Sequence, residues 1–167
     1  MPVGIDARTV VACAATPYLT VQDAAASLSF YEQAFGFTPE QTISTPGGRV
    51  IHAAMHYDGA LAIRFSPEGV WSGVMKSPAT TGTAMPITLC VACPDVGALD
   101  ALAERARAAG ATIVTEPCDV FWGERITRIA DPDGYLWCFA VKVSEVDPAM
   151  MPAVEEVEAG LDLDLGF

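Results

Sequence analysis

The chain has 167 residues, of which 51% are hydrophobic, and carries a formal net charge of −12 at pH 7. This length and apolar content suffice for one domain, or for two small halves that share a core, and they exclude global disorder. With only 9 Lys and Arg residues, nucleic acid is not an expected partner, because phosphate binding needs basic side chains. An acidic surface suits a cationic small molecule, although it is also common in ordinary soluble domains.

The cysteines and the N-terminus indicate the compartment. Five cysteines are an odd number, with Cys90 and Cys93 closest together, and we expect reduced thiols rather than a disulfide framework. The chain shows no basic segment followed by an apolar leader, and no apolar run of membrane length. We therefore expect a cytoplasmic protein that does not bind a membrane.

Residues 1–15 form an N-terminal arm or an edge strand, and residues 16–70 form the first module. A strand is predicted over residues 16–21, and Asp23 is placed to cap the helix that follows. Gly36 ends the helix, and residues 37–49 read as a polar connection. Two further strands, over 50–57 and 60–65, are joined by an Asp58-Gly59 hairpin turn. The apolar stripe of the helix comprises Ala24, Leu28, Tyr31 and Phe35.

Residues 71–85, rich in Ser, Pro, Gly and Thr, read as a linker that carries Trp71. The pattern then restarts in a second module over residues 86–143. A strand over 87–91 precedes a helix that begins at Pro94-Asp95 and ends at Gly110. The helix is followed by a strand over 111–115. The buried stripe predicted for this helix comprises Val96, Leu99, Leu102, Ala103 and Ala106.

The second module ends in a predicted hairpin that spans residues 121–140. Asp131-Pro-Asp-Gly134 is its tight turn, because proline presets φ at the first central position and glycine accepts a positive φ. After the turn, Trp137 and Phe139 alternate with Leu136, Cys138 and Ala140.

The two modules repeat one β-α-β-β-β unit. The sequence therefore predicts an α+β fold, in which two paired modules form a curved mixed sheet around a cleft, with the helices outside. Residues 144–167 form an acidic C-terminal tail.

Several of these segments resemble the vicinal-oxygen-chelate superfamily, which includes glyoxalase I, the bleomycin-resistance proteins and the extradiol dioxygenases. The segments Tyr18-Leu-Thr-Val-Gln-Asp23, Phe30-Tyr31 and Phe35-Gly36 are similar to the opening strand and helix of that family. The motifs Phe121-Trp-Gly-Glu-Arg125 and Asp131-Pro-Asp-Gly134, with Ala108-Ala-Gly-Ala111, most resemble its PhnB-like branch. The resemblance implies paired modules, a homodimer and a small-molecule site in each cleft.

The same resemblance supplies a test for a metal. Metal-dependent members use four ligands, typically His, Glu, His and Glu, with positions left open for the substrate. In this sequence the corresponding positions are occupied by Thr16, Ile63, Pro86 and Cys138. These residues do not reproduce the ligand set, and we predict no metal and no other cofactor.

Three residues are weak candidates for chemistry without a metal. His52 and His56 face the same side of a predicted strand but lie roughly 13 Å apart at about 3.3 Å per residue, too far to share one ion. His56 could act as a general base or as a hydrogen-bond donor. Cys138 could act as a nucleophile, although it has no evident basic partner. Tyr18 is the third candidate.

The leading hypothesis is a protein that has lost the metal ligands and sequesters a small, aromatic or cationic molecule, such as a drug or metabolite, in its cleft. The alternative is an enzyme of the same superfamily (lyase, isomerase or dioxygenase type) that uses His56, Tyr18 or Cys138. Arg64, Arg125 and Arg128 keep an anionic ligand possible, unless they form surface ion pairs with residues such as Glu124 or Asp131. The predicted ligand-binding residues are Tyr18, Thr20, His52, His56, Trp71, Thr88, Phe121, Trp122 and Cys138.

Overall fold

The computed structural model describes residues 15–147 and residue 149. The chain divides into two compact units: the first extends to Lys76 except for Gln33–Phe35, which belong with the second unit, from Ser77 onward. Residues 1–14 of the predicted N-terminal arm and most of the predicted acidic tail lie outside the described residues.

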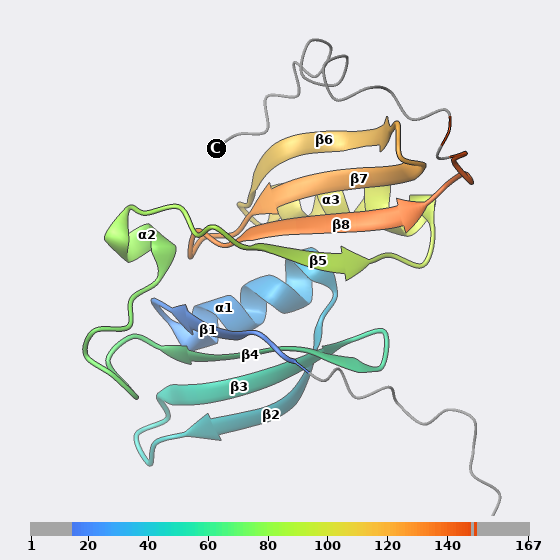
Figure 1. The fold of residues 1–167 in the computed structure, drawn as a ribbon. Helices are drawn as coiled ribbons and strands as arrows, with labels where there is room; N and C mark the ends of the chain where they lie inside the picture. Colours follow the sequence, from blue (N-terminus) through green and yellow to red (C-terminus); the bar gives the residue numbers. More distant parts are fainter. Residues whose placement is uncertain (1–14, 148, 150–167) are drawn as a thin grey trace, which may run out of the picture. The chain divides into compact units, whose positions relative to one another are not determined.

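The first unit contains one four-stranded mixed sheet (Figure 1). The strands lie in the order β1-β4-β3-β2, with β1 parallel to β4 and the other pairs antiparallel. Helix α1 packs against β3 and β4. The elements in chain order are β1 (Tyr18–Val21), α1 (Ala24–Phe30) with a π-helical turn at Tyr31–Phe35, β2 (Thr38–Ser44), β3 (Val50–Tyr57) and β4 (Ala60–Pro67).

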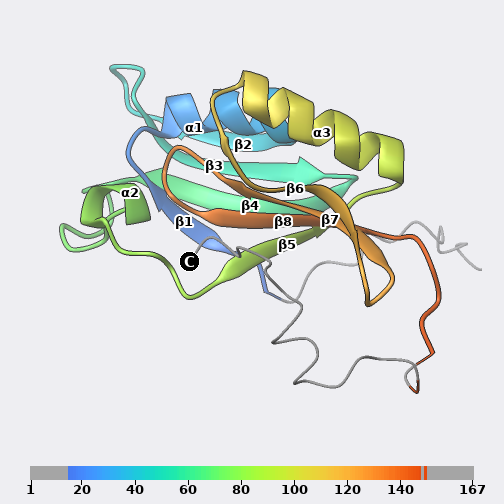
Figure 2. The ribbon, with the colours of Figure 1, turned by 90° about the horizontal axis from the view of Figure 1, so that it is seen from above.

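The second unit repeats this architecture. Its sheet has the order β5-β8-β7-β6, again with one parallel pair, β5 and β8. Helix α3 packs against β6, β7 and β8, as Figure 2 also shows. The elements are α2 (Pro78–Thr81), β5 (Thr88–Ala92), α3 (Val96–Ala108), β6 (Thr112–Val120), β7 (Glu124–Ala130) and β8 (Leu136–Lys142). The predicted α+β fold of two β-α-β-β-β modules is confirmed.

The predicted helix ends are also observed. The Asp23 carboxylate accepts hydrogen bonds from the backbone N–H groups of Ala25 and Ala26 at 2.9 and 3.0 Å. The Asp95 carboxylate accepts one from Ala98 at 2.8 Å. These bonds satisfy N–H groups that have no partner inside the helix.

The polar connection predicted over residues 37–49 is wrong, because it contains β2. Every residue of β2 is exposed, since it is an edge strand paired only with β3. An edge strand with both faces in solvent has no apolar alternation to detect, and Pro39 is tolerated there beside a bulge in the register. Val96, predicted as part of the buried stripe of α3, is exposed.

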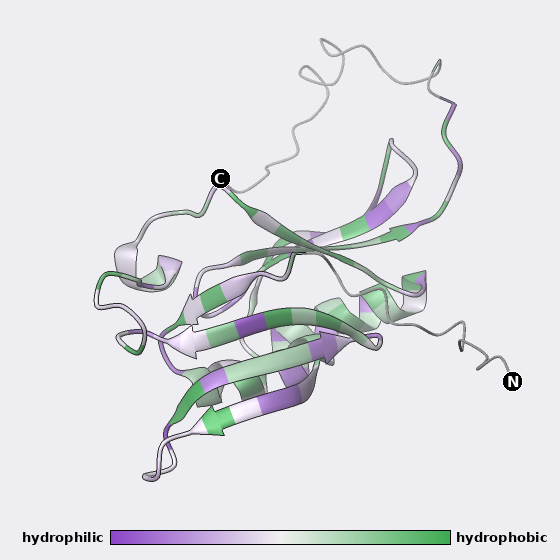
Figure 3. Ribbon diagram, turned by 60° about the horizontal axis from the view of Figure 1, so that its bottom comes forward, coloured by the Kyte–Doolittle hydropathy of each residue, from purple (hydrophilic) through white to green (hydrophobic). Residues whose placement is uncertain are grey.

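In both units the covered face of the sheet is apolar. The hydropathy of the strands alternates along their length (Figure 3), as expected for sheets with only one covered face. In the second unit the rings of Phe35 and Phe139 lie with centroids 4.8 Å apart, and Trp137 lies 5.2 Å from Phe35. In the first unit Tyr31 contacts Phe37 and Phe65.

The Asp131-Pro-Asp-Gly134 turn is part of this core rather than a surface loop. Asp131 is buried, and its two carboxylate oxygens accept bonds from the Tyr135 backbone N–H at 2.9 Å and from the Trp137 indole N–H at 2.8 Å. A buried indole N–H needs such a partner, and a carboxylate is a strong acceptor. The turn therefore fixes the start of β8 and the position of its largest core side chain.

Gly134 has a second role beyond its positive φ of 86°. A Cβ at this position would lie 2.9 Å from the backbone nitrogen of Ala79 and 3.0 Å from Pro78 Cβ in α2. The Ala79 N–H in turn donates a 2.8 Å hydrogen bond to the Asp133 carbonyl. The glycine therefore allows α2 to dock on the turn.

Candidate functional site

In the first unit, three predicted ligand-binding residues meet on the sheet face that α1 does not cover. The indole N–H of Trp71 donates a 3.0 Å hydrogen bond to Tyr18 Oη. The same oxygen lies 2.9 Å from His52 Nδ1. The Tyr18 and His52 rings are 5.7 Å apart, tilted by 35°. We call these three residues the Trp71 cluster.

Electrostatics define the protonation of the Trp71 cluster. Burial, and secondly the charge of Arg64, hold the pKa of His52 below its ordinary value. Arg64 is the register partner of Tyr18 across β1 and β4. Because Trp71 already donates to Tyr18, the Tyr18 hydroxyl is free to donate to an unprotonated Nδ1. At neutral pH the cluster is therefore an uncharged aromatic surface.

Two other predicted residues of the first unit lie outside this hydrogen-bonded group. Thr20 is buried. His56 Nε2 lies 3.5 Å from a carboxylate oxygen of Glu40 on β2. The structure thus brings together Tyr18, His52 and Trp71, and gives His56 a different partner.

In the second unit the open sheet face carries one polar row across all four strands. Cys90 pairs with Cys138, Cys138 with Arg128, and Arg128 with Thr115 in consecutive register positions. We call these four residues the Arg128 row. It contains Cys138, which the sequence predicts as a site residue, together with Arg128 and Thr115, which the sequence does not place beside it.

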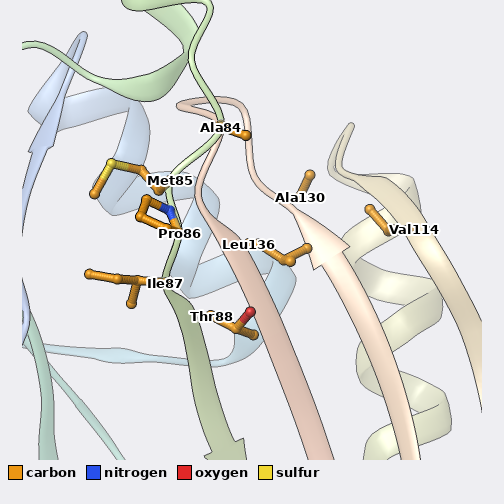
Figure 4. Close-up of a pocket in the computed structure, with 9 residues that line it drawn as sticks. Ala84, Met85, Pro86, Ile87, Thr88, Val114, Ala130 and Leu136 are labelled. Carbon is orange, nitrogen blue, oxygen red and sulfur yellow. The ribbon is translucent and has the colours of Figure 1, made fainter. Parts of the chain in front are cut away.

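Two pockets lie along this face. One, of about 620 Å³, is lined mainly by apolar side chains, and Figure 4 shows Leu136, Ala130 and Val114 projecting from adjacent strands on the same side, with α3 behind them. Predicted Thr88 lines the same pocket. The other pocket, of about 750 Å³, includes Cys90, Cys138, Glu124 and Lys142.

Cys138 is not an activated nucleophile. Burial, and secondly the neighbouring Cys90, raise the pKa of the Cys138 thiol, although the charge of Arg128 and a hydrogen bond from it act in the opposite direction. A thiol, rather than a thiolate, is therefore present at neutral pH. The expectation that Cys138 has no basic partner is wrong.

The hairpin register is the signal that could have identified Arg128. Around a tight turn, antiparallel residues pair symmetrically, so that Ala130 faces Leu136 and Arg128 faces Cys138. The basic residue therefore lies next to Cys138 in space although it lies on the other side of the Asp131–Gly134 turn in sequence.

The remaining predicted residues of the second unit lie elsewhere. Phe121 and Trp122 occupy the turn between β6 and β7, with ring centroids 4.9 Å apart, and the Trp122 indole N–H donates to Glu124 at 2.8 Å. Arg125 pairs with Asp100 and Asp119, both at 2.9 Å, and not with the predicted partners Glu124 or Asp131. Its guanidinium therefore stabilises structure and is occupied.

The positions implied for family metal ligands do not match a His and Glu set. Ile63 is 1% exposed and lies on the covered face, in register with Met55. Thr16, Ile63, Pro86 and Cys138 offer one hydroxyl, two side chains without a donor atom and a thiol.

Within residues 15–147, no group of three or more His, Cys, Asp or Glu side chains could hold a metal ion. Cys90 and Cys93, the two cysteines closest together in the sequence, have Cys-x-x-Cys spacing. Cys90 is exposed on β5, while Cys93 is buried just beyond it. Three residues of extended chain separate them by about 10 Å, too far for a disulfide or a shared ion.

No helix in the described part of the chain is long and apolar enough to cross a membrane.

Comparisons with known proteins agree with this architecture. A sequence profile described as the glyoxalase/bleomycin resistance protein/dioxygenase superfamily matches residues 10–139. Uncharacterised proteins Mb0911c of Mycobacterium bovis and Rv0887c of Mycobacterium tuberculosis are each 33% identical over 149 residues, covering 89% of this chain and 91% and 82% of their own lengths.

Solved structures show the same fold. TioX from Micromonospora sp. ML1 is 26% identical with a TM-score of 0.60, covering 77% of this chain and 97% of its own. A glyoxalase/bleomycin resistance protein/dioxygenase from Nocardioides is 20% identical with a TM-score of 0.58, covering 90% of this chain and 93% of its own. The second similarity supports the fold alone.

Proposed function

The chain belongs to the glyoxalase/bleomycin resistance protein/dioxygenase superfamily, and from this premise we propose that it is a metal-independent small-molecule-binding protein that sequesters an aromatic compound. We further propose that it belongs to the PhnB-like branch, on the motifs Phe121-Trp-Gly-Glu-Arg125 and Asp131-Pro-Asp-Gly134. A cytoplasmic homodimer is part of the same proposal.

One observation carries the proposal: the exposed but anchored indole of Trp71. This side chain is 63% exposed, yet its N–H is bound to Tyr18, which contacts His52. A large apolar side chain fixed in solvent by its polar atom offers a flat face that is already oriented for stacking. An aromatic ligand would remove that face from water without breaking the hydrogen bonds beneath it.

The charge distribution favours a neutral aromatic ligand over a cationic one at this position. The net charge of the chain is −12, but the charge acting on the Trp71 cluster is the guanidinium of Arg64, which lowers the His52 pKa. A nearby positive charge would oppose a bound cation. The net negative charge of the chain therefore does not determine the charge of the ligand at the Trp71 cluster.

The side chains at the four family ligand positions support the proposal that the protein binds its ligand without a metal. Proline has no side-chain donor, and neutral hydroxyls are poor substitutes for the imidazole and carboxylate ligands of zinc sites. The residues Thr16, Ile63, Pro86 and Cys138 therefore do not fit the metal of the metal-dependent relatives. We derive no reaction through a metal in this chain.

Calorimetric titration with the neutral aromatic probe 4-phenylbutanamide tests this function. We expect binding that Trp71→Ala weakens by about tenfold or more, because stacking of one aromatic face contributes about 1–3 kcal/mol. Met75→Ala is the matched control, since Met75 is also exposed and lies in the same segment. Treatment with a chelator should leave the affinity unchanged. Binding that depends on added Zn²⁺, Ni²⁺, Mn²⁺ or Fe²⁺ would overturn the proposal, as would equal effects of the two substitutions.

The Tyr18–His52 hydrogen bond supports one alternative, an enzyme that uses this pair for acid–base chemistry. A hydroxyl that can donate to a neutral imidazole is a possible proton donor. Of the other two candidates, His56 lies against Glu40 and Cys138 carries a protonated thiol. If an activity is found, Tyr18→Phe should abolish turnover, with only a partial loss of ligand affinity from the lost hydrogen bond to Trp71. Unchanged turnover in that variant would remove this alternative.

A further inference from the structure

Arg128 differs from Arg107 and Arg125, two other arginines of the second unit. Arg125 is paired with Asp100 and Asp119, and Arg107 with Glu104 and Glu116. Arg128 forms no salt bridge with any described residue, and its Nη1 atom is buried without a hydrogen-bond partner in the described chain. Leaving a charged donor buried and unsatisfied is costly, so this guanidinium is not explained by the stability of the fold.

The neighbours of Arg128 in its row cannot neutralise it. Cys138 carries a neutral thiol at physiological pH because the pKa of that group is raised. Thr115, the register partner on β6, also has a buried Oγ1 atom without a partner. Two adjacent side chains thus offer polar atoms that no described residue uses.

Glu124 is the acidic residue on β7 that faces the same side of the sheet. It lies four residues from Arg128 along the strand, about 13 Å away at 3.3 Å per residue. Its carboxylate accepts the Trp122 indole N–H at 2.8 Å. The cross-strand register partner of Glu124 is Lys142. The charge of Glu124 contributes to the raised pKa of Cys138, but Glu124 forms no salt bridge with Arg128 among the described residues.

The surface on the other side of Arg128 is apolar. The adjacent register positions are Leu136 and Ala130, and both line the pocket of about 620 Å³ together with Met85, Ile87 and Val114 (Figure 4). A molecule that placed an anionic group against Arg128 could extend its apolar part into this pocket. A carboxylate can accept two parallel N–H bonds from one guanidinium, which adds orientation to affinity.

We propose that Arg128 is an anion-binding position on the open face of the second sheet, and that the second unit takes an amphipathic acid, with a carboxylate at Arg128 and an apolar chain along Leu136, Ala130 and Val114. This site goes beyond the proposed function, because it involves none of the residues of the Trp71 cluster.

Titration with three probes that share one alkyl chain tests the site: octanoate, octanamide and octylamine. None has an aromatic ring, so their binding does not depend on the stacking proposed at Trp71. In the wild-type protein octanoate should bind about tenfold or more tightly than octanamide, as expected for a charge-assisted hydrogen bond, and octylamine should bind weakest.

Substitutions then separate charge from packing. Arg128→Met should reduce the affinity for octanoate to that for octanamide and leave octanamide unchanged. Arg128→Lys should retain part of the preference, because the charge remains but the planar fork is lost. Arg64→Met is the matched control in the first unit and should leave the octanoate affinity within about twofold. Equal binding of acid and amide to the wild type, or a preference for octanoate that survives in Arg128→Met, would overturn the site.

A second measurement keeps the test decisive if none of the alkyl probes binds. Inorganic phosphate, added at constant ionic strength, should slow alkylation of Cys138 in the wild type and have no effect in Arg128→Met. Absence of protection in the wild type would overturn the anion-binding position. Absence of phosphate protection would not change the Trp71-dependent binding of 4-phenylbutanamide. Conversely, a failure of 4-phenylbutanamide to bind would not change phosphate protection. The two proposals can therefore fail independently.

Discussion

The hairpins β3–β4 and β7–β8 are the same element of the repeat, but their turns differ. The first turn, Asp58-Gly59, has positive φ angles of 48° and 75°, and no atom lies near the place that a Cβ on Gly59 would occupy. The second turn is anchored by Asp131 and covered by α2 at Gly134. The Asp131-Pro-Asp-Gly134 motif therefore stabilises the core of the second unit. Its presence does not indicate whether the protein catalyses a reaction.

The open faces of these hairpins differ as well. In the first unit burial, and secondly the charge of Arg64 beside Tyr18, lower the His52 pKa and leave the Trp71 cluster uncharged. In the second unit Arg128 lies beside Cys138 and has an unsatisfied nitrogen. One repeat thus supports an aromatic surface on one sheet and an unpaired cation on the other. The scaffold fixes the strand positions, while a few side chains determine what each face can bind.

The largest effect should come from adding a methyl group to each turn. Gly134→Ala combines a positive φ with a clash against α2, and we expect it to lower the free energy of unfolding by about 3 kcal/mol. Gly59→Ala has the same backbone cost in open space, and we expect about 1 kcal/mol. Urea denaturation of both variants measures the difference. Equal losses would show that α2 does not press on the second turn.

The next effect concerns the carboxylates of the two turns. Asp131→Asn replaces one of two accepting oxygens by a donor that faces another N–H group, and should lower the free energy of unfolding by about 2 kcal/mol. Asp58→Asn should change it by less than about 0.5 kcal/mol, because asparagine tolerates a positive φ and the site is exposed. Near-ultraviolet circular dichroism would report the released Trp137 in the first variant. An Asp131→Asn protein as stable as Asp58→Asn would contradict the anchoring role.

A smaller effect is expected in the chemistry of the Arg128 row. Iodoacetamide reacts with thiolates, so at pH 8 exposed Cys90 should be alkylated well before Cys138, whose pKa is raised by burial. Arg128→Met should slow Cys138 further, because the guanidinium is one of the groups that stabilise its thiolate. Peptide mass spectrometry gives both rates in one sample. Faster labelling of Cys138 in the variant would show that Arg128 shields the thiol rather than stabilising its anion.

Most of the fold could be predicted from the sequence because local signals agreed with the tertiary structure. Capping aspartates, glycine stops and the Asp58-Gly59 turn each define a boundary by local chemistry. Strand β2 could not be predicted, because an edge strand with two solvated faces has no periodic signal. Ile63 lies on the covered face of its sheet, and the bulge between Met55 and His56 that changes the register beside it is invisible in sequence.

The candidate site was predicted only where strand alternation suffices. Tyr18 and His52 lie on the same face by simple period-two counting, and Trp71 joins them through a loop. Arg128 could have been assigned to Cys138 by counting outward from the turn. The sequence could not predict that the Arg128 Nη1 atom lacks a hydrogen-bond partner, because this depends on which neighbouring atoms fill the space around it.

The smallest expected effect is the pH dependence that His52 gives to the first unit. Its pKa in the folded protein lies below the ordinary value, through burial and then Arg64, so the unfolded chain binds its proton more tightly. Stability from this group is therefore complete above a pH of about 6.5 and is lost as the pH falls below it. When the pH is lowered from 7.5 to 5.5, the midpoint of urea denaturation should decrease less in His52→Gln than in the wild type, with His56→Gln as the control.

The His52 pKa itself can be measured by NMR titration of the imidazole in the His56→Gln background, and Arg64→Gln should raise it. In the protein that retains Arg64, a His52 pKa at or above its ordinary value of about 6.5 would contradict the uncharged aromatic surface inferred for the first unit.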